Sequence, residues 1–160
     1  MGIDPEYAYA SAAMRVEIFT IGFTRTTAES FFGRLSNARV RRILDVRLSN
    51  TSQLAGFAKA QDLPYFLERL VGAVYEHEPL LAPTPELFET RKRRGGGWPE
   101  FERGFRALME ERRVEEWLAP ADFEAPTALL CSEARAEECH RSLVCEHLAR
   151  HWRDVRAVHL

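Results

Sequence analysis

Residues 16–35 read VEIFTIGFTRTTAESFFGRL, and two different periodicities follow one another in them. The first six residues are rich in β-branched and aromatic side chains, which predicts a strand that ends at Gly22. Thr26 and Glu29 then form a candidate capping box at the start of a helix. The helical spacing that follows is carried by Phe31, Phe32 and Leu35. A buried strand followed directly by an amphipathic helix is typical of an α/β fold.

The same alternation continues along the chain. Further short apolar strands are expected at residues 43–46, 73–77, 127–131 and 155–160. Helices are expected between them, at residues 59–70, 85–94, 98–116 and 137–151. Strands that alternate with helices predict a mainly parallel sheet of about five strands with helices on both faces, which is a three-layer α/β fold.

Length and charge describe one ordinary globular domain. The chain has 160 residues, of which 22 are Lys or Arg and 24 are Asp or Glu, and its formal net charge is -2. This balance excludes a generally basic nucleic-acid-binding protein but leaves room for a local basic patch. We expect a single α/β domain over residues 14–160 and treat residues 1–13 as a leader or extension.

Hydropathy and cysteine usage bear on where the protein works. No apolar run approaches the roughly 18 residues that a membrane-spanning helix needs, so we expect a soluble protein with no membrane partner. Cys131, Cys139 and Cys145 lie in one short segment, and an odd, clustered set of cysteines does not form a disulfide framework. Reduced thiols of this kind are typical of a cytoplasmic protein, and we expect that location.

Polar residues follow several of the expected strands. In open parallel sheets, ligands bind outside the carboxyl ends of the strands. Thr24, Asp45, Arg47, Cys131 and Glu133 all come at such ends or just after them. The sequence therefore predicts a polar crevice at this edge of the sheet.

Asp45 and Arg47 end the second expected strand on the same side of the sheet. In a functional interpretation, the forked guanidinium of Arg47 binds a phosphate or carboxylate, and Asp45 orients it or acts as a base. In a structural interpretation, the two side chains form an ion pair that closes the edge of the core. The pattern leaves both interpretations open.

Cys131 ends the fourth expected strand and precedes a helix, whose N-terminal amides could stabilise a thiolate. This order of elements, in which a strand ends in a cysteine and a short loop with Arg135 leads into a helix, resembles the layout of rhodanese-type sulfurtransferases. The loop lacks the glycine that such loops use to turn their amides inward. No cysteine lies five residues before an arginine that is followed by a hydroxyl residue, which disfavours a cysteine phosphatase. The alternative is a buried, inert strand cysteine.

Arg141 follows Cys139 and His140 in the first turn of the last expected helix. Its place on that helix predicts a side chain that leans inward, where an unpaired arginine is costly. Asp45 or Glu133 would satisfy it structurally, and a bound phosphate would satisfy it functionally. Both interpretations stay open.

Several cysteines and histidines lie close together between residues 131 and 151, which raises the question of a metal site. None of the cysteines forms a paired C-x-x-C. His147 and His151 have the only good helical ligand spacing, and two ligands make a weak site without a third. We therefore expect no metal and no other cofactor.

A basic run, Arg91, Lys92, Arg93 and Arg94, is followed by three glycines and Trp98. Such a segment could lie along a nucleic-acid backbone while the indole stacks on a base. The alternative is a helix C-terminus whose cations complement the helix dipole. Nucleic acid therefore stays among the candidate partners, together with an anionic small molecule.

Several segments between residues 16 and 160 occur in a specific order: TIG (20–22), LDVR (44–47), NTSQLAGF (50–57), HEPLLAPT (77–84), CSE (131–133), CHRSL (139–143) and VHL (158–160). In that order they resemble the domain of unknown function 488 family. The resemblance implies a compact α/β domain, but it implies no reaction. It also implies that a set of polar residues shares one pocket, namely Asp45, Arg47, Lys59, Glu133, Cys139, His140 and Arg141.

Three functions fit these residues, in our order of preference. The first is binding of a phosphate-bearing ligand, such as a nucleotide or a nucleic-acid end, with acid–base groups for hydrolysis if the site is catalytic. The binding residues would be Thr24, Arg47, Lys59 and Arg141, and the acid–base groups Asp45, Glu133 and His140.

The second function is a non-catalytic module that docks on nucleic acid or on a protein through residues 91–94. The third is thiol chemistry, in which Cys131 or Cys139 is a nucleophile that accepts sulfur or forms a transient disulfide. The residue pattern leaves enzyme and binding module as alternatives.

Overall fold

The computed structural model describes residues 15–51, 55–92 and 97–160. Five strands form one sheet in the order β3-β2-β4-β1-β5, and every neighbouring pair is parallel. The expected parallel sheet of about five strands is therefore confirmed. The strands are β1 (Val16–Gly22), β2 (Arg42–Asp45), β3 (Val74–His77), β4 (Thr127–Cys131) and β5 (Val155–His159).

Six α-helices connect these strands in the described ranges. They are α1 (Ala28–Asn37), α2 (Leu63–Leu70), α3 (Pro85–Lys92), α4 (Gly97–Glu111), α5 (Val114–Trp117) and α6 (His140–His151). Three short 3-10 helices precede α2, α3 and β4: η2 (Gly56–Ala58), η3 (Pro79–Leu81) and η4 (Pro120–Phe123).

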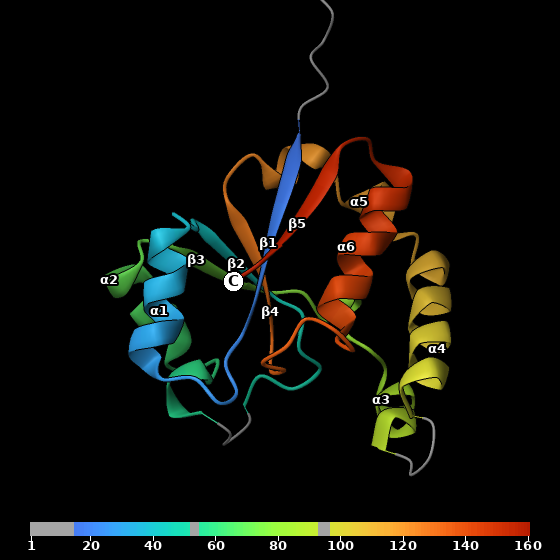
Figure 1. Cartoon of the computed structure of the whole chain (residues 1–160), viewed down its shortest axis with the longest axis horizontal. Coiled ribbons are helices and arrows are strands. Elements are labelled where there is room, and N and C mark those ends of the chain that lie inside the picture. Colours follow the sequence, from blue (N-terminus) through green and yellow to red (C-terminus); the bar gives the residue numbers. More distant parts are fainter. Residues whose placement is uncertain (1–14, 52–54, 93–96) are drawn as a thin grey trace, which may run out of the picture.

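The helices lie on both faces of the sheet, as Figure 1 shows. α1 and α2 bury apolar side chains in one cluster with Ala128 and Leu130 of β4. α4, α5 and α6 belong to a second cluster, which includes Leu129 and Cys131. Because successive strand residues face opposite sides, β4 contributes to both clusters in turn. The three-layer arrangement agrees with the fold class expected from the sequence.

β4 lies in the middle of the sheet although it comes late in the chain. The chain passes from β1 to β2 and β3, then returns to place β4 between β1 and β2, and finally adds β5 beyond β1. Because all pairs are parallel, the carboxyl ends of the strands meet at one edge. The order reverses at β4, and ligands of such sheets bind outside that point. Cys131 is the last residue of β4.

Several element boundaries differ from the sequence prediction, and α6 begins at His140 rather than at residue 137. The cap of α1 is Thr27 rather than Thr26, because the Thr27 hydroxyl accepts the Ser30 amide at 3.1 Å. α2 begins four residues later than expected, because residues 59–62 form a turn between η2 and α2. The single helix expected over 98–116 is divided, since Arg113 has a φ of 49° and separates α4 from α5.

Two further expectations concern the start of the chain and membrane-spanning helices. The expectation that residues 1–13 form a leader or extension lies outside the described residues. Within the described ranges, no helix combines the length and the apolar character that crossing a membrane requires.

Candidate functional site

A cavity of about 410 Å³ opens outside the carboxyl end of β4. Its lining includes Arg47 from the segment after β2, Arg91 from α3, Cys131 from β4 and His140 from α6. Segments far apart in the sequence therefore meet at the edge of the sheet where the strand order reverses. A cavity thus lies at the edge where the sequence predicted a crevice.

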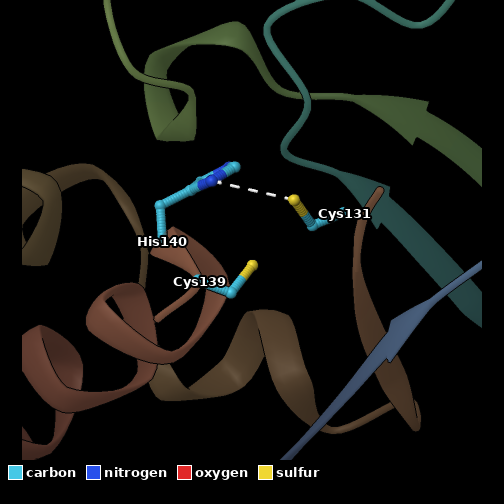
Figure 2. Close-up of side chains that lie close together, drawn as sticks. All are labelled: Cys131, Cys139 and His140. Carbon is cyan, nitrogen blue, oxygen red and sulfur yellow. Dashed lines mark hydrogen bonds between the residues drawn. The ribbon is translucent and has the colours of Figure 1, made fainter. Parts of the chain in front are cut away.

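Cys131 and His140 point toward each other, as Figure 2 shows. Cys131 Sγ lies 3.7 Å from His140 Nδ1, and both side chains are buried. The other ring nitrogen, Nε2, lies 2.6 Å from the carbonyl oxygen of Val46. Because a carbonyl oxygen only accepts, Nε2 carries a hydrogen and donates it. Nδ1 is therefore the nitrogen that exchanges a proton with the thiol.

The pKa of the Cys131 thiol is lowered well below its ordinary value. The largest cause is a hydrogen bond from the Cys139 thiol, and burial opposes it. The positive charge of His140 and a hydrogen bond from the Glu133 backbone lower the pKa further. Burial alone would lower the pKa of His140. The charge and hydrogen bond of the facing Cys131 outweigh this effect and raise the pKa above its ordinary value. Both directions favour transfer of the thiol proton from Cys131 to His140.

Cys139 lies directly before α6 and is fully buried. Its sulfur, the Cys131 sulfur and a His140 ring nitrogen all lie within 4.8 Å of one another. Cys131, and then burial, raises the pKa of Cys139 well above its ordinary value, so Cys139 keeps its proton and donates it in a hydrogen bond. Burial raises the pKa of Cys145 to about 12. Among the three cysteines, Cys131 is therefore the one suited to act as a nucleophile.

Arg91 brings a positive charge to the cavity. Its guanidinium lies over the rings of Trp98 and Phe101, 5.5 Å and 5.8 Å from their centroids. Nη2 of Arg91 also lies 3.6 Å from Oε1 of Glu133, whose side chain is 46% exposed. The sequence prediction treated Arg91 as part of a separate surface run, whereas the fold brings it to the lining that holds Cys131.

The other members of the predicted basic patch do not share this position. Lys92 pairs with Glu89 at 2.7 Å on the surface of α3. Trp98 stacks on Phe101 at 5.6 Å and is partly buried, so one face of the indole is already occupied. Arg93 and Arg94 lie outside the described residues.

Asp45 and Arg47 form a buried, two-pronged ion pair. Arg47 Nε and Nη2 lie 2.8 Å and 2.6 Å from the two carboxylate oxygens, and the Arg47 amide donates to the same group. The Tyr75 hydroxyl donates the fourth hydrogen bond to Asp45, at 2.6 Å. Both carboxylate oxygens thus accept two hydrogen bonds each. This geometry favours the structural interpretation of Asp45, while Arg47 still reaches the cavity wall.

Arg141 leans inward as its helical position predicted, and it is 1% exposed. Its guanidinium donates to the carbonyl oxygens of Glu133 and Ala134, at 2.5 Å and 3.5 Å, and to Thr20 Oγ1 at 3.3 Å. Backbone carbonyls, rather than a carboxylate, satisfy this arginine. Its position indicates that it holds the loop after Cys131 in place.

The remaining predicted site residues fall into two groups. Thr24 donates its hydroxyl to Ser132 O at 2.8 Å and so also fixes the loop after Cys131. Lys59 follows η2 and Arg135 is exposed beside Glu137, and neither lines the cavity. The cavity lining therefore contains Arg47, Cys131, Glu133 and His140 from the predicted set, but not Asp45, Lys59, Cys139 or Arg141.

Sequence reasoning did not assign Arg91 or Phe88 to the cavity. Both belong to α3, which follows the edge strand β3 and reaches the site only because the chain then crosses back to β4. The available signal was the proline-started helix at Pro85, which indicated an element but not the face that it covers. A crossover of this kind brings residues together that no local pattern connects.

A parallel α/β domain with a Cys–His pair at the carboxyl end of its central strand is the class that this fold and this site define. The chain belongs to the family described as Domain of unknown function DUF488, whose model matches residues 27–148. The matched range includes every residue of the cavity described above. Searches of curated proteins and of solved structures found no match.

Proposed function

We propose that this chain is a cysteine-dependent enzyme that transfers a group from a small anionic substrate, with Cys131 as the nucleophile. The observation that carries the proposal is the Cys131 Sγ to His140 Nδ1 distance of 3.7 Å, with His140 Nε2 anchored on Val46 O. A nucleophile, a base and a group that orients the base are the three parts such a reaction requires. Here a backbone carbonyl does the orienting.

The charges around the cavity support an anionic substrate. Arg91 and Arg47 both line it, and the α6 N-terminus adds a partial positive charge. The guanidinium of Arg47 is held by Asp45, which fixes its position, whereas the carboxylate contact of Arg91, to the half-exposed Glu133, is longer at 3.6 Å. Arg91 is therefore the more available partner for an anion.

Sulfur transfer is the reaction class that we propose for this site. The Cys131 thiolate attacks the outer sulfur of a thiosulfonate-type donor, a new sulfur–sulfur bond forms, and the donor's own sulfur–sulfur bond breaks. The leaving sulfite or sulfinate departs with the electron pair, and Cys131 is left as a persulfide. His140, as an imidazolium, offers its Nδ1 proton to the leaving anion or to the persulfide.

Non-covalent binding of a phosphate-bearing ligand by Arg47, Lys59 and Arg141 has less support. The Arg141 donors are engaged with backbone carbonyls, and Lys59 is not part of the cavity lining. Docking on nucleic acid through residues 91–94 has little support from the described part of that run, because Arg91 packs against Trp98 beside the cavity and Lys92 is paired with Glu89. Both stay as hypotheses.

Alkylation kinetics test the proposal. Iodoacetamide should modify Cys131 at neutral pH, and peptide mass spectrometry should show Cys145 unmodified as an internal control, since burial raises its pKa to about 12. An ordinary thiol is only a few per cent thiolate at pH 7, so a lowered pKa should raise the rate roughly tenfold or more. His140→Gln should move the reactivity profile to higher pH.

Incubation with thiosulfate tests the reaction class. The product should carry the mass of one additional sulfur atom on the Cys131 peptide, and cyanide should remove it as thiocyanate. Cys131→Ser should abolish both. Equal alkylation rates for Cys131 and Cys145 would contradict the assignment of Cys131 as the nucleophile. Fast alkylation without persulfide formation would contradict sulfur transfer but would leave that assignment intact.

A further inference from the structure

A second cluster of ligand-type side chains lies near the other end of α6. Glu110 from α4, Glu115 from α5, and His147 and His151 from α6 each present one ligand atom, and these atoms all lie within 4.8 Å of one another. His147 is seven residues from His140, which is roughly 10 Å along the helix axis. The cluster is therefore separate from the cavity that holds Cys131.

His147 carries an unpartnered nitrogen at the centre of this cluster. The side chain is 1% exposed, and within the described ranges its Nδ1 is the buried side-chain nitrogen or oxygen that lacks a hydrogen-bond partner. Its Nε2 lies 2.8 Å from Oε2 of Glu115, which accepts the ring hydrogen. In the neutral ring Nδ1 presents a lone pair, 3.5 Å from Oε1 of Glu110. A lone pair and a carboxylate oxygen that face each other in this way can be bridged by a cation.

His151 completes the arrangement from one turn further along α6. Its Nε2 lies 3.7 Å from Oε2 of Glu110, and its ring centroid lies 4.6 Å from that of His147. The outer side of Glu110 also faces Arg150, whose Nη2 lies 3.6 Å from Oε1 and whose side chain is 48% exposed. Arg150 offers this carboxylate only a long, exposed contact, which a metal ion can displace.

We propose that Glu110, His147 and His151 bind a divalent transition metal, with Zn²⁺ as the cation that best fits two imidazoles and one carboxylate. Glu115 orients His147 by accepting its ring hydrogen, as the outer carboxylates of metal-bound histidines do. The expectation of no metal depended on the lack of a third ligand near His147 and His151. The fold supplies that ligand from α4, and the metal ties α4, α5 and α6 together.

Metal titration of the chelator-treated chain tests this site. Zn²⁺ should bind with a stoichiometry of one and raise the melting temperature. Glu110→Gln and His151→Gln should each weaken the affinity at least tenfold, and both positions are partly exposed, so the variants should fold. Glu115→Gln should weaken it about 10- to 100-fold. Glu111→Gln, an exposed neighbour on α4, is the matched control and should bind like the unaltered chain.

Cobalt spectroscopy separates this site from the thiols, because Cys131, Cys139 and His140 also lie within 4.8 Å of one another. Bound Co²⁺ should show ligand-field absorption without the thiolate-to-metal charge transfer that cysteine ligands produce. The proposal is overturned if Zn²⁺ does not bind. It is equally overturned if binding survives unchanged in Glu110→Gln and His151→Gln, or if the cobalt spectrum is that of a thiolate site.

Discussion

At the scale of single residues, burial and hydrogen bonding shift the pKa values of Cys131, Cys139 and Cys145 differently. Cys131 accepts hydrogen bonds and faces the His140 ring, Cys139 donates to Cys131, and Cys145 lies among apolar side chains of α6. The sequence could place Cys131 at a strand end and Cys139 at a helix start. It could not rank them, because their pKa values depend on which groups the fold brings to each sulfur.

Glu133 should reduce the affinity of the cavity for anions, because it pairs with Arg91 at 3.6 Å. Glu133→Gln should therefore speed the modification of Cys131 by iodoacetate relative to iodoacetamide, two reagents of nearly the same size that differ in charge. The ratio should rise by up to about fivefold, which corresponds to the ~1 kcal/mol of a partly exposed ion pair. Arg91→Met should lower the same ratio, and a ratio that neither variant changes would show that Arg91 does not attract anions to the cavity.

Asp45→Asn should destabilise the fold strongly. Arg47 would lose the negative charge that offsets its burial, because its side chain is 2% exposed and that of Asp45 is 0% exposed. Breaking a buried pair in this way costs about 3–5 kcal/mol of unfolding free energy, measured by urea denaturation. Glu76→Gln is the control, since its pair with Arg42 is exposed and should cost under about 1 kcal/mol. Similar losses of unfolding free energy in the two variants would contradict the difference between the buried and the exposed ion pair.

At the scale of elements, the loop after β4 is fixed by contacts from three sides. Thr24 and Arg141 hold the carbonyl oxygens of residues 132–134, and the last residue of β1, Gly22, lies directly against Glu133. A Cβ atom at Gly22 would lie 1.7 Å from the Glu133 carbonyl oxygen. The absence of a side chain there lets the loop approach β1 closely enough to aim the Glu133 amide at Cys131.

Gly22→Ala should therefore displace the loop and lower both stability and the reactivity of Cys131. We expect a loss of more than about 2 kcal/mol, because backbone atoms must move to relieve the overlap. Gly33→Ala in α1 is the matched control: a Cβ there meets nothing within 4 Å. That change should stabilise the helix by about 0.5–1 kcal/mol. Urea denaturation and iodoacetamide rates measure the two effects, and an unaffected Gly22→Ala protein would contradict the close approach.

At the scale of the whole molecule, the alternation of strands and helices predicted the architecture. The cavity depends on the order of the strands in the sheet, which that alternation does not specify. The strand ends near Asp45 and Cys131 were predicted from the sequence, since each apolar run is followed there by polar residues. The carbonyl partners of Arg141 were not predicted, because a side chain's partners depend on crossovers between distant segments. Arg91 reaches the Cys131 cavity only through the return of the chain from β3 to β4.

Alkaline pH should destabilise the whole fold. Burial raises the pKa of Cys145 from its ordinary 9.0 to about 12, and burial together with Asp45 raises that of Tyr75 from 10.0 to about 12. Both groups are held neutral in the folded state, so their contribution is complete below the unfolded pKa and is lost as pH rises toward 12. The Cys145 contribution is at most about 4 kcal/mol. Urea denaturation between pH 8 and 11 should show the loss, and Cys145→Ala should reduce its slope.

The late position of β4 in the chain also sets the order in which the molecule can be made. β1 and β2, 20 residues apart, have no direct pairing and must wait for residues 127–131 before either gains its central neighbour. Long-range parallel pairing of this kind is slow and leaves strand edges open in the partly synthesised chain. Cys131, the proposed nucleophile, therefore arrives with the strand that closes the sheet, so the proposed site cannot form in a nascent chain until that strand has been made.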